Sequence, residues 1–199
     1  MNRFSQPRRS TLHFFMVILA LALCQLGTQK EASGSVVLAM TLEDLARQAD
    51  IILLGKCERI YSEWGPERKD IFTYIAIIPE QCLKGKECPP QVIIRQLGGR
   101  VDNIALTVPG TPRFHLDERV LVFLQMTSAS QYIVIGLSQG KYGVVTDAKD
   151  GKSYVTRDLN NLSLVKKRDE DFYIKKANSE NEKVVLETFI EEIRSYLDF

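Results

Sequence analysis

The sequence predicts a mainly β domain with flanking α-helices, folded as a small antiparallel barrel. Six short segments rich in Ile, Val, Tyr and Phe follow one another between turn residues, and no long helix interrupts them. A short helical pattern lies on each side of the series. Many short strands in this order favour a closed or nearly closed barrel. The predicted strands are 51–61, 71–78, 91–96, 119–125, 132–137 and 142–146.

Residues 1–34 have the features of a secretory signal peptide. Basic residues precede an unbroken apolar run, Phe14–Cys24, which is too short to span a bilayer but suits the apolar region of a leader. The small residues of the 32–34 step favour cleavage there, and the 37–39 step is the alternative site. We therefore expect the mature chain to start near Ser35.

Other export signals are weaker in this leader. Lipidation of Cys24 is disfavoured because Leu23 stands where a lipoprotein signal requires a small residue. Arg8 and Arg9 resemble a twin-arginine signal only faintly, since basic residues begin any leader. An uncleaved membrane anchor would need a longer apolar run. The prediction is an exported protein, secreted or periplasmic, with no membrane span after the leader is removed.

The charge of the mature chain gives no reason to expect a nucleic-acid partner. Residues 1–34 hold four of the 26 basic and one of the 25 acidic residues, which leaves 22 against 24. A near-neutral chain lacks the basic surface that nucleic-acid binding requires. The remaining residues are enough for one domain with a hydrophobic core of its own, without help from a metal or another cofactor.

A short helix is predicted just before the first strand. Thr41 is suited to the N-cap position, and Asp44 stands three residues later, as in a capping box. Apolar residues then recur at Leu42, Leu45, Ala46 and Ala49, so the helix can pack on the barrel. At the other end of the series, Asp150-Gly151 predicts a hairpin turn.

The barrel domain is expected to cover residues 35–160 and to be followed by a tail, 161–199. The tail begins with a polar segment that we expect to be exposed. Ser179 and Glu182 form a capping-box pair that predicts the start of a last helix. Its apolar side is expected to dock on the barrel, a partner site being the alternative. That side consists of Leu186, Phe189, Ile190, Ile193 and Leu197.

The cysteines outside the leader predict one disulfide and one free thiol. Cys82 and Cys88 can approach each other across a Lys-Gly-Lys turn in an oxidising compartment. Cys57 falls on the apolar face of a predicted strand, where burial raises the pKa of a thiol, so we interpret it as a core residue. A reactive nucleophile is the alternative. His115 is the only histidine after the leader, so no zinc or other metal site is predicted.

The strand sequences are similar to those of the netrin-like domains, a family that includes the tissue inhibitors of metalloproteinases. The resemblance runs from about Ala49 to Gly136. It implies an OB-like barrel of five strands with helices against it. The residues that carry it are ADIILLGKCERI, FTYIAIIPEQCLKGKE, QVIIRQ and DERVLVFLQ.

The chain departs from that family at its mature N-terminus. The inhibitory members begin with a Cys-x-Cys whose terminal amine and carbonyl chelate the zinc ion of the protease. No such motif stands between Ser35 and Asp50. Inhibition by that chemistry is therefore not implied for this chain.

The long connection at 97–118 is the candidate recognition loop. It far exceeds an ordinary hairpin loop, and the segment NIALTV within it is suited to a small strand. Gly98-Gly99 permits a close approach of the backbone, and Pro109-Gly110 predicts a type II turn. An ordered lid without a binding role is the alternative. The polar residues expected to gather at this end of the barrel are Arg100, Asp102, Arg113, His115 and Asp117.

These features predict a binding module without catalytic residues. Its partner is expected to be another extracytoplasmic protein, a protease being one candidate, because exposed loops on a rigid scaffold often carry recognition. The first alternative is a small secreted hydrolase or thiol enzyme that uses Cys57 or His115. The second is an envelope structural protein without a discrete site.

Overall fold

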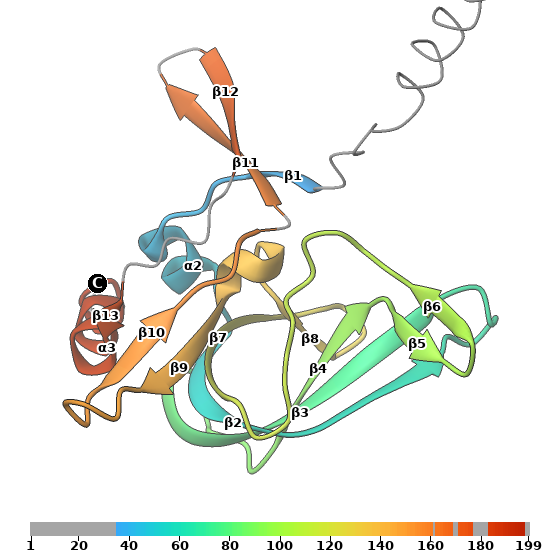
Figure 1. Ribbon diagram of the computed structural model, residues 1–199, viewed down its shortest axis with the longest axis horizontal. Helices are drawn as coiled ribbons and strands as arrows, with labels where there is room; N and C mark the ends of the chain where they lie inside the picture. The colour runs from blue at the N-terminus through green and yellow to red at the C-terminus, as the bar shows by residue number, and fades with distance from the viewer. Residues whose placement is uncertain (1–34, 161, 169–170, 177–182, 198–199) are drawn as a thin grey trace, which may run out of the picture. The chain divides into compact units, whose positions relative to one another are not determined.

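Five strands close on one another in the computed structural model and form the OB-like barrel that the sequence predicts (Figure 1). Around the ring the order is β2-β3-β4-β8-β7, and β7 pairs again with β2. The pairing of β4 with β8 is parallel, and the other four pairings are antiparallel. The strands are β2 (Ile51–Trp64), β3 (Ile71–Lys84), β4 (Val92–Leu97), β7 (Arg119–Met126) and β8 (Tyr132–Val134).

The structure describes residues 35–160, 162–168, 171–176 and 183–197. The predicted leader, including Cys24, and the predicted cap residues Ser179 and Glu182 lie outside the described residues.

The barrel strands separate two hydrophobic cores. Alternate residues of β7 point to opposite faces: Val120, Val122 and Leu124 join the core inside the barrel, whereas Leu121 and Phe123 join the core beneath the helices. All five are fully buried. A strand that is buried on both faces has no polar alternation, which explains the continuous apolar run in its sequence.

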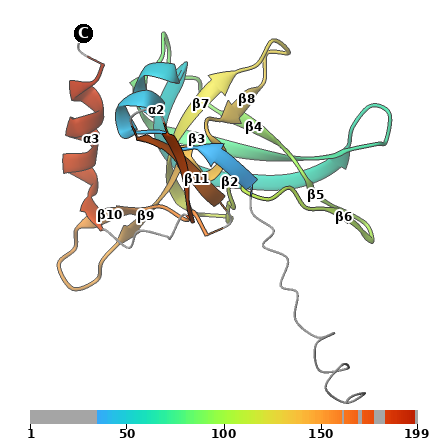
Figure 2. The ribbon, with the colours of Figure 1, turned by 90° about the horizontal axis from the view of Figure 1, so that it is seen from above.

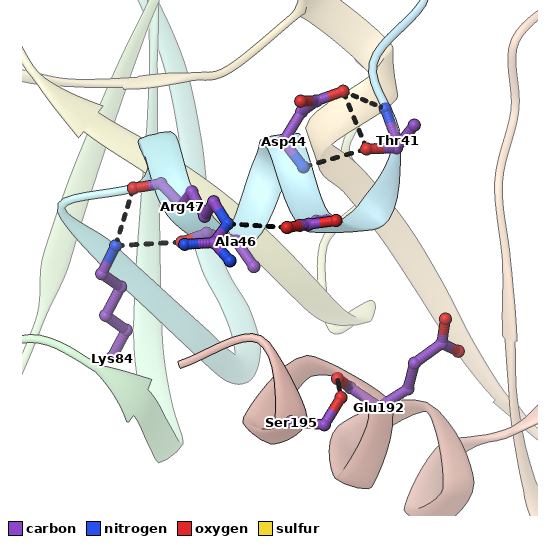
Figure 3. Close-up of polar contacts among 8 residues, drawn as sticks. Thr41, Asp44, Ala46, Arg47, Lys84, Glu192 and Ser195 are labelled. Carbon is purple, nitrogen blue, oxygen red and sulfur yellow. Dashed lines mark hydrogen bonds and ion pairs between the residues drawn. The ribbon is translucent and has the colours of Figure 1, made fainter. Parts of the chain in front are cut away.

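The first helix, α2 (Leu42–Gln48), begins with the predicted capping box (Figure 3). The backbone N–H of Asp44 donates to Thr41 Oγ1 at 3.0 Å, and the backbone N–H of Thr41 donates to Asp44 Oδ2 at 2.8 Å. At the other end Lys84 Nζ donates to the carbonyls of Ala46 and Arg47, which would otherwise lack partners. Both ends of this short helix are therefore satisfied by side chains.

The C-terminal helix, α3 (Leu186–Ser195), lies beside α2 on one side of the barrel (Figure 2). Its buried residues Leu186, Phe189, Ile190 and Ile193 enter the same core as α2. The helix starts later than the capping-box pair predicts, because Val185 is its N-cap and residues 184–185 form the short strand β13 (Val184–Val185). Pairing of this strand with β10 (Ser153–Thr156) competes with helix formation at the start of the stretch.

The polar tail contributes strands to a second sheet. β1 (Ser35–Leu38) pairs in parallel with β11 (Leu162–Arg168), and β11 pairs antiparallel with β12 (Asp171–Lys176). The sequence predicted only a polar segment here, since its charged residues hide the alternation of a strand. The pairing with β1 joins residues from opposite ends of the domain, so no local pattern could predict it.

The large sheet continues beyond the barrel through β9 (Lys141–Thr146) and β10. The predicted hairpin joins these two strands, and Gly151 in its turn has φ +68°. A short 3₁₀ helix, η1 (Leu137–Gly140), connects β8 to β9. Gln139 on η1 is almost fully buried. Its amide donates to the carbonyl of Leu38 at 3.0 Å, and its Oε1 accepts from the N–H of Met40 at 2.9 Å.

The predicted disulfide is present. Cys82 and Cys88 are bonded, with their Cα atoms 5.7 Å apart, at the turn after β3. Disulfides are typical of proteins outside the reducing cytosol. No helix in the described part of the chain has the length and apolar character needed to cross a membrane.

The double glycine lets the hairpin β5 (Gly99–Val101) and β6 (Ile104–Leu106) pack against β2 and β3. Thr73 Oγ1 donates to the carbonyl of Gly98 at 2.7 Å and shares a hydrogen bond with Ser62 Oγ at 2.9 Å. A Cβ atom at Gly99 would lie less than 3.0 Å from both hydroxyl oxygens, and its φ is +142°. Only glycine fits this approach.

We expect Gly99→Ala to lower the free energy of unfolding by about 2–4 kcal/mol, because overpacking adds to backbone strain. Urea denaturation measures the change. Gly151→Ala is the matched control: its φ is also positive, but nothing lies within 4 Å of the added Cβ, so about 1 kcal/mol is expected. Equal losses for the two variants would contradict the close approach at Gly99.

The capping box predicts a pH dependence at the acidic end. Hydrogen bonds from the backbone N–H and then the hydroxyl of Thr41 lower the pKa of Asp44 from its ordinary value of 3.8. This group therefore stabilises the fold above pH 3.8, and the contribution is lost as the pH falls through the lower folded-state pKa. Asn at this position keeps an acceptor but cannot titrate. Asp44→Asn should show a smaller drop in Tm between pH 5 and pH 3 than the wild type, and equal drops would exclude this contribution.

Candidate functional site

The long connection consists of the β5–β6 hairpin and a loop, residues 107–118, that leads to β7. β6 coincides with the small strand expected within NIALTV. The hairpin turns at Asp102, which has φ +52°. Aspartate tolerates this left-handed conformation better than most residues do, so Asp102 has a structural role in the turn.

The loop is fixed at its first turn by contacts with distant parts of the chain. Pro109 and Gly110 occupy the centre of a turn with φ +84° at Gly110, as a type II turn requires. Ser35 Oγ donates to the carbonyl of Pro109 at 2.6 Å, and the N–H of Ser138 donates to the carbonyl of Gly110 at 2.9 Å. A side chain at Gly110 would collide with Leu162. The turn is thereby held against β1, η1 and β11.

The end of the loop is fixed to β2. The N–H of Asp117 donates to the carbonyl of Cys57 at 2.9 Å, and the N–H of Cys57 donates to the carbonyl of Glu118 at 2.8 Å. Asp117 has φ +64°, and its carboxylate pairs with Lys56 at 2.6 Å, which raises the pKa of the lysine. Asp117 therefore fixes the turn through its backbone and forms an ion pair at the surface through its carboxylate.

The structure does not bring the five predicted loop residues into one group. Arg100 and Asp102 belong to the β5–β6 hairpin, which Figures 1 and 2 show on the other side of the domain from β9 and β10. Arg113 and His115 both line the same two cavities, and β9 contributes to one of them. Asp117 is turned toward Lys56.

The side chains of Arg113 and His115 differ from those of their neighbours in the loop. Pro112 is buried, and Phe114 packs against the core inside the barrel, so alternate residues of the segment 112–115 pack on the barrel. Arg113 and His115 are exposed. Neither side chain has an ion pair or hydrogen bond with any other described residue. A fixed backbone therefore presents two polar groups that are free to bind something else.

One cavity, of about 300 Å³, lies between this segment and the barrel. We call it the barrel-side cavity, and its lining includes Ile60, Thr73, Ile75, Gln96, Phe114 and the two free loop residues. Strands β2, β3 and β4 supply the first four of these. Gln96 Oε1 is buried and has no hydrogen-bond partner among the described residues. A buried acceptor without a donor is costly, by about 1–3 kcal/mol, and calls for an explanation.

The second cavity, of about 260 Å³, lies on the other side of the segment and is polar. At its base Lys141 pairs with Glu118, and both side chains are largely buried. The other Glu118 oxygen accepts from the N–H of His115 at 3.1 Å. Gly143 lies below the pair, and a Cβ there would be 3.1 Å from Glu118 Oε1. Its missing side chain leaves room for the pair.

Four residues that line one of the two cavities were not predicted from the sequence: Gln96, Glu118, Lys141 and Asp158. Each stands in an ordinary strand or turn pattern that does not mark it as part of a site. Glu118 and Lys141 are brought together only by the pairing of β7 with β9. Glu118 was nevertheless within reach of prediction, because it is an acidic residue two positions before the apolar run 120–124.

Cys57 lies inside the barrel and is fully buried. Burial and, next, the negative charge of Glu118 raise the pKa of its thiol. A thiolate is the reactive form, so this environment disfavours nucleophilic chemistry. The described residues contain no group of three His, Cys, Asp or Glu side chains that could hold a metal ion.

No protein-family model matches this chain, and no curated protein matches it either.

The burial of Cys57 predicts protection from alkylation. With iodoacetamide under native conditions, the peptide that contains Cys57 should stay unmodified, and it should be fully modified in 6 M guanidinium. Peptide mass spectrometry reads this thiol separately from Cys24. Native modification faster than that of a free thiol such as glutathione would contradict the core position and favour a thiol enzyme.

Proposed function

We propose that this chain is an exported, non-enzymatic binding module that engages an extracytoplasmic protein through the 107–118 loop. A protease is one candidate partner. The observation that carries the proposal is the state of the Arg113 and His115 side chains. Both are exposed and have no ion pair or hydrogen bond with another described residue, on a backbone that is fixed at both ends. A backbone that is already fixed loses little conformational entropy on binding, so the entropic cost is confined to ordering the two side chains.

Two further features support export and the netrin-like relationship as parts of the proposal. The composition of residues 1–34 suits a secretory leader, and the Cys82–Cys88 disulfide suits an oxidising compartment. An OB-like barrel with helices against it is the fold that the netrin-like resemblance implies. The absence of Cys-x-Cys near Ser35 leads us to propose a binding mode other than chelation of a protease zinc.

A hydrolase or thiol enzyme is less well supported. Cys57 is buried with a raised thiol pKa, and His115 has no carboxylate hydrogen-bonded to its imidazole in the described residues. A general base normally needs such a partner for orientation. A structural envelope protein would need no free polar groups on a fixed loop.

Site-specific photo-cross-linking tests the proposal. The full chain is expressed with its leader, and a photoreactive amino acid replaces Leu116, which is 62% exposed in the loop. We expect one dominant cross-linked protein in the extracytoplasmic fraction. The same group at exposed Lys149, in the β9–β10 turn, should not give that product.

Arg113→Ala should abolish the cross-link while Tm changes by less than about 1 °C, since surface substitutions have small effects on stability. Arg194→Ala is the matched control, because Arg194 is an exposed arginine on α3. Equal cross-linking from positions 116 and 149, or an unchanged product with Arg113→Ala, would contradict recognition by the loop.

A further inference from the structure

We propose that the partner presents an aspartate or glutamate side chain to Arg113, with an adjacent apolar residue entering the barrel-side cavity. This inference rests on the proposed function and adds the chemistry of the segment that is recognised. Four observations carry it: the charge of Arg113, the pairing of the neighbouring lysines with carboxylates, the lining of the barrel-side cavity and the size of that cavity.

The guanidinium of Arg113 forms no ion pair with any other described residue, whereas the neighbouring lysines are paired with carboxylates. Lys141 pairs with Glu118, and Lys56 pairs with Asp117. Among the described residues that line the barrel-side cavity, Arg113 is the only arginine, lysine or acidic residue. A guanidinium fork without a partner matches a carboxylate, which it can bind through two parallel hydrogen bonds.

The walls of the barrel-side cavity favour an apolar group next to the carboxylate. Ile60 and Phe114, both half-buried, supply aliphatic and aromatic surface. The polar wall consists of Thr73 and Thr111, whose hydroxyls already donate to the carbonyls of Gly98 and Val108, and of Gln96. The buried Gln96 Oε1 can accept from a backbone N–H of the partner segment. An apolar side chain of the partner would remove this surface from water, and the carboxylate would stay at the exposed edge with Arg113.

The size of the cavity points to a peptide segment. About 300 Å³ is at the lower limit of small-molecule pockets and holds one or two side chains. It cannot admit a helix. An extended acidic segment at the surface of a folded partner fits these limits.

The surrounding acidic groups disfavour a polyanion. Asp117 and Glu118 engage the two lysines beside the loop, and Asp158 lines the polar cavity, so Arg113 is left as a single available positive charge. A phosphodiester chain needs several positive charges along its length, whereas one carboxylate needs only one. A single charge next to apolar surface is therefore the better match.

Selection from a random peptide library tests the inference. The full chain, with its disulfide intact, is immobilised and panned against phage-displayed peptides of twelve residues. We expect enrichment of sequences with Asp or Glu beside an apolar residue. The affinity of one enriched peptide, made with an amidated C-terminus, is then measured by fluorescence polarisation.

Arg113→Gln should weaken binding of that peptide by about tenfold to a hundredfold, the range for a charge-assisted hydrogen bond. Arg113→Lys should lose less affinity, because lysine keeps the positive charge. Some loss is still expected, since lysine lacks the planar guanidinium that binds a carboxylate through two hydrogen bonds. Arg194→Gln should bind as the wild type does. Replacement of the acidic residue of the peptide by its amide should reproduce the loss seen with Arg113→Gln.

Two outcomes overturn the inference and leave the proposed function standing. One is enrichment of peptides without Asp or Glu, and the other is equal binding by wild type and Arg113→Gln. Phosphopeptides that outcompete the carboxylate peptide would reassign the ligand. No enrichment above that obtained with Arg113→Gln also overturns it, and the cross-link from position 116 then decides the proposed function separately.

Discussion

The architecture of this domain depends on the hydrogen bonding of β7 along both of its edges. One edge pairs with β2, and the other pairs with β8 and β9, so the same strand closes the barrel and carries the sheet outward to β10. Its two faces enter two different cores, one within the barrel and one beneath the helices. A polar residue on either face would therefore disrupt the packing of one of the two cores. Because α3 and α2 pack on the outer of these cores, the helices depend on β7 as much as the barrel does.

The same strand positions the candidate site. The loop reaches β7 directly after Glu118, and the pairing of β7 with β9 places Lys141 beside that carboxylate. Once Glu118 is engaged by Lys141 and by the backbone of His115, the backbone of residues 115–118 is restrained. The turn at Gly110 restrains the other end through contacts with Ser35 and Ser138. A loop backbone held in this way loses little freedom on binding, which is the usual advantage of a loop on a rigid barrel.

Local patterns were enough to predict the parts of the fold whose causes are local. The Thr41–Asp44 capping box, the strands rich in β-branched residues and the Cys82–Cys88 bond each depend on residues a few positions apart. The start of α3 at Leu186 and the strand β11 were not predicted, because partners distant in sequence decide them. The residues of the site also divide into those that a local pattern reveals and those that only the tertiary fold brings in. Arg113 and His115 stand out in a Gly/Pro-rich loop, but Gln96 and Lys141 become part of the cavities only through tertiary pairing.

The parallel pairing of β1 with β11 has a consequence for the order in which the domain can form. Ser35 pairs with Leu162, and the link after β1 is held by Gln139, so the partners of the first strand are among the last to be synthesised. Contacts of such long sequence separation form late, because the intervening chain must first be ordered. The segment next to the predicted leader is therefore without its sheet while most of the chain is being made. Until that pairing forms, the backbone N–H and C=O groups of residues 35–38 lack the sheet partners that β11 supplies in the folded domain.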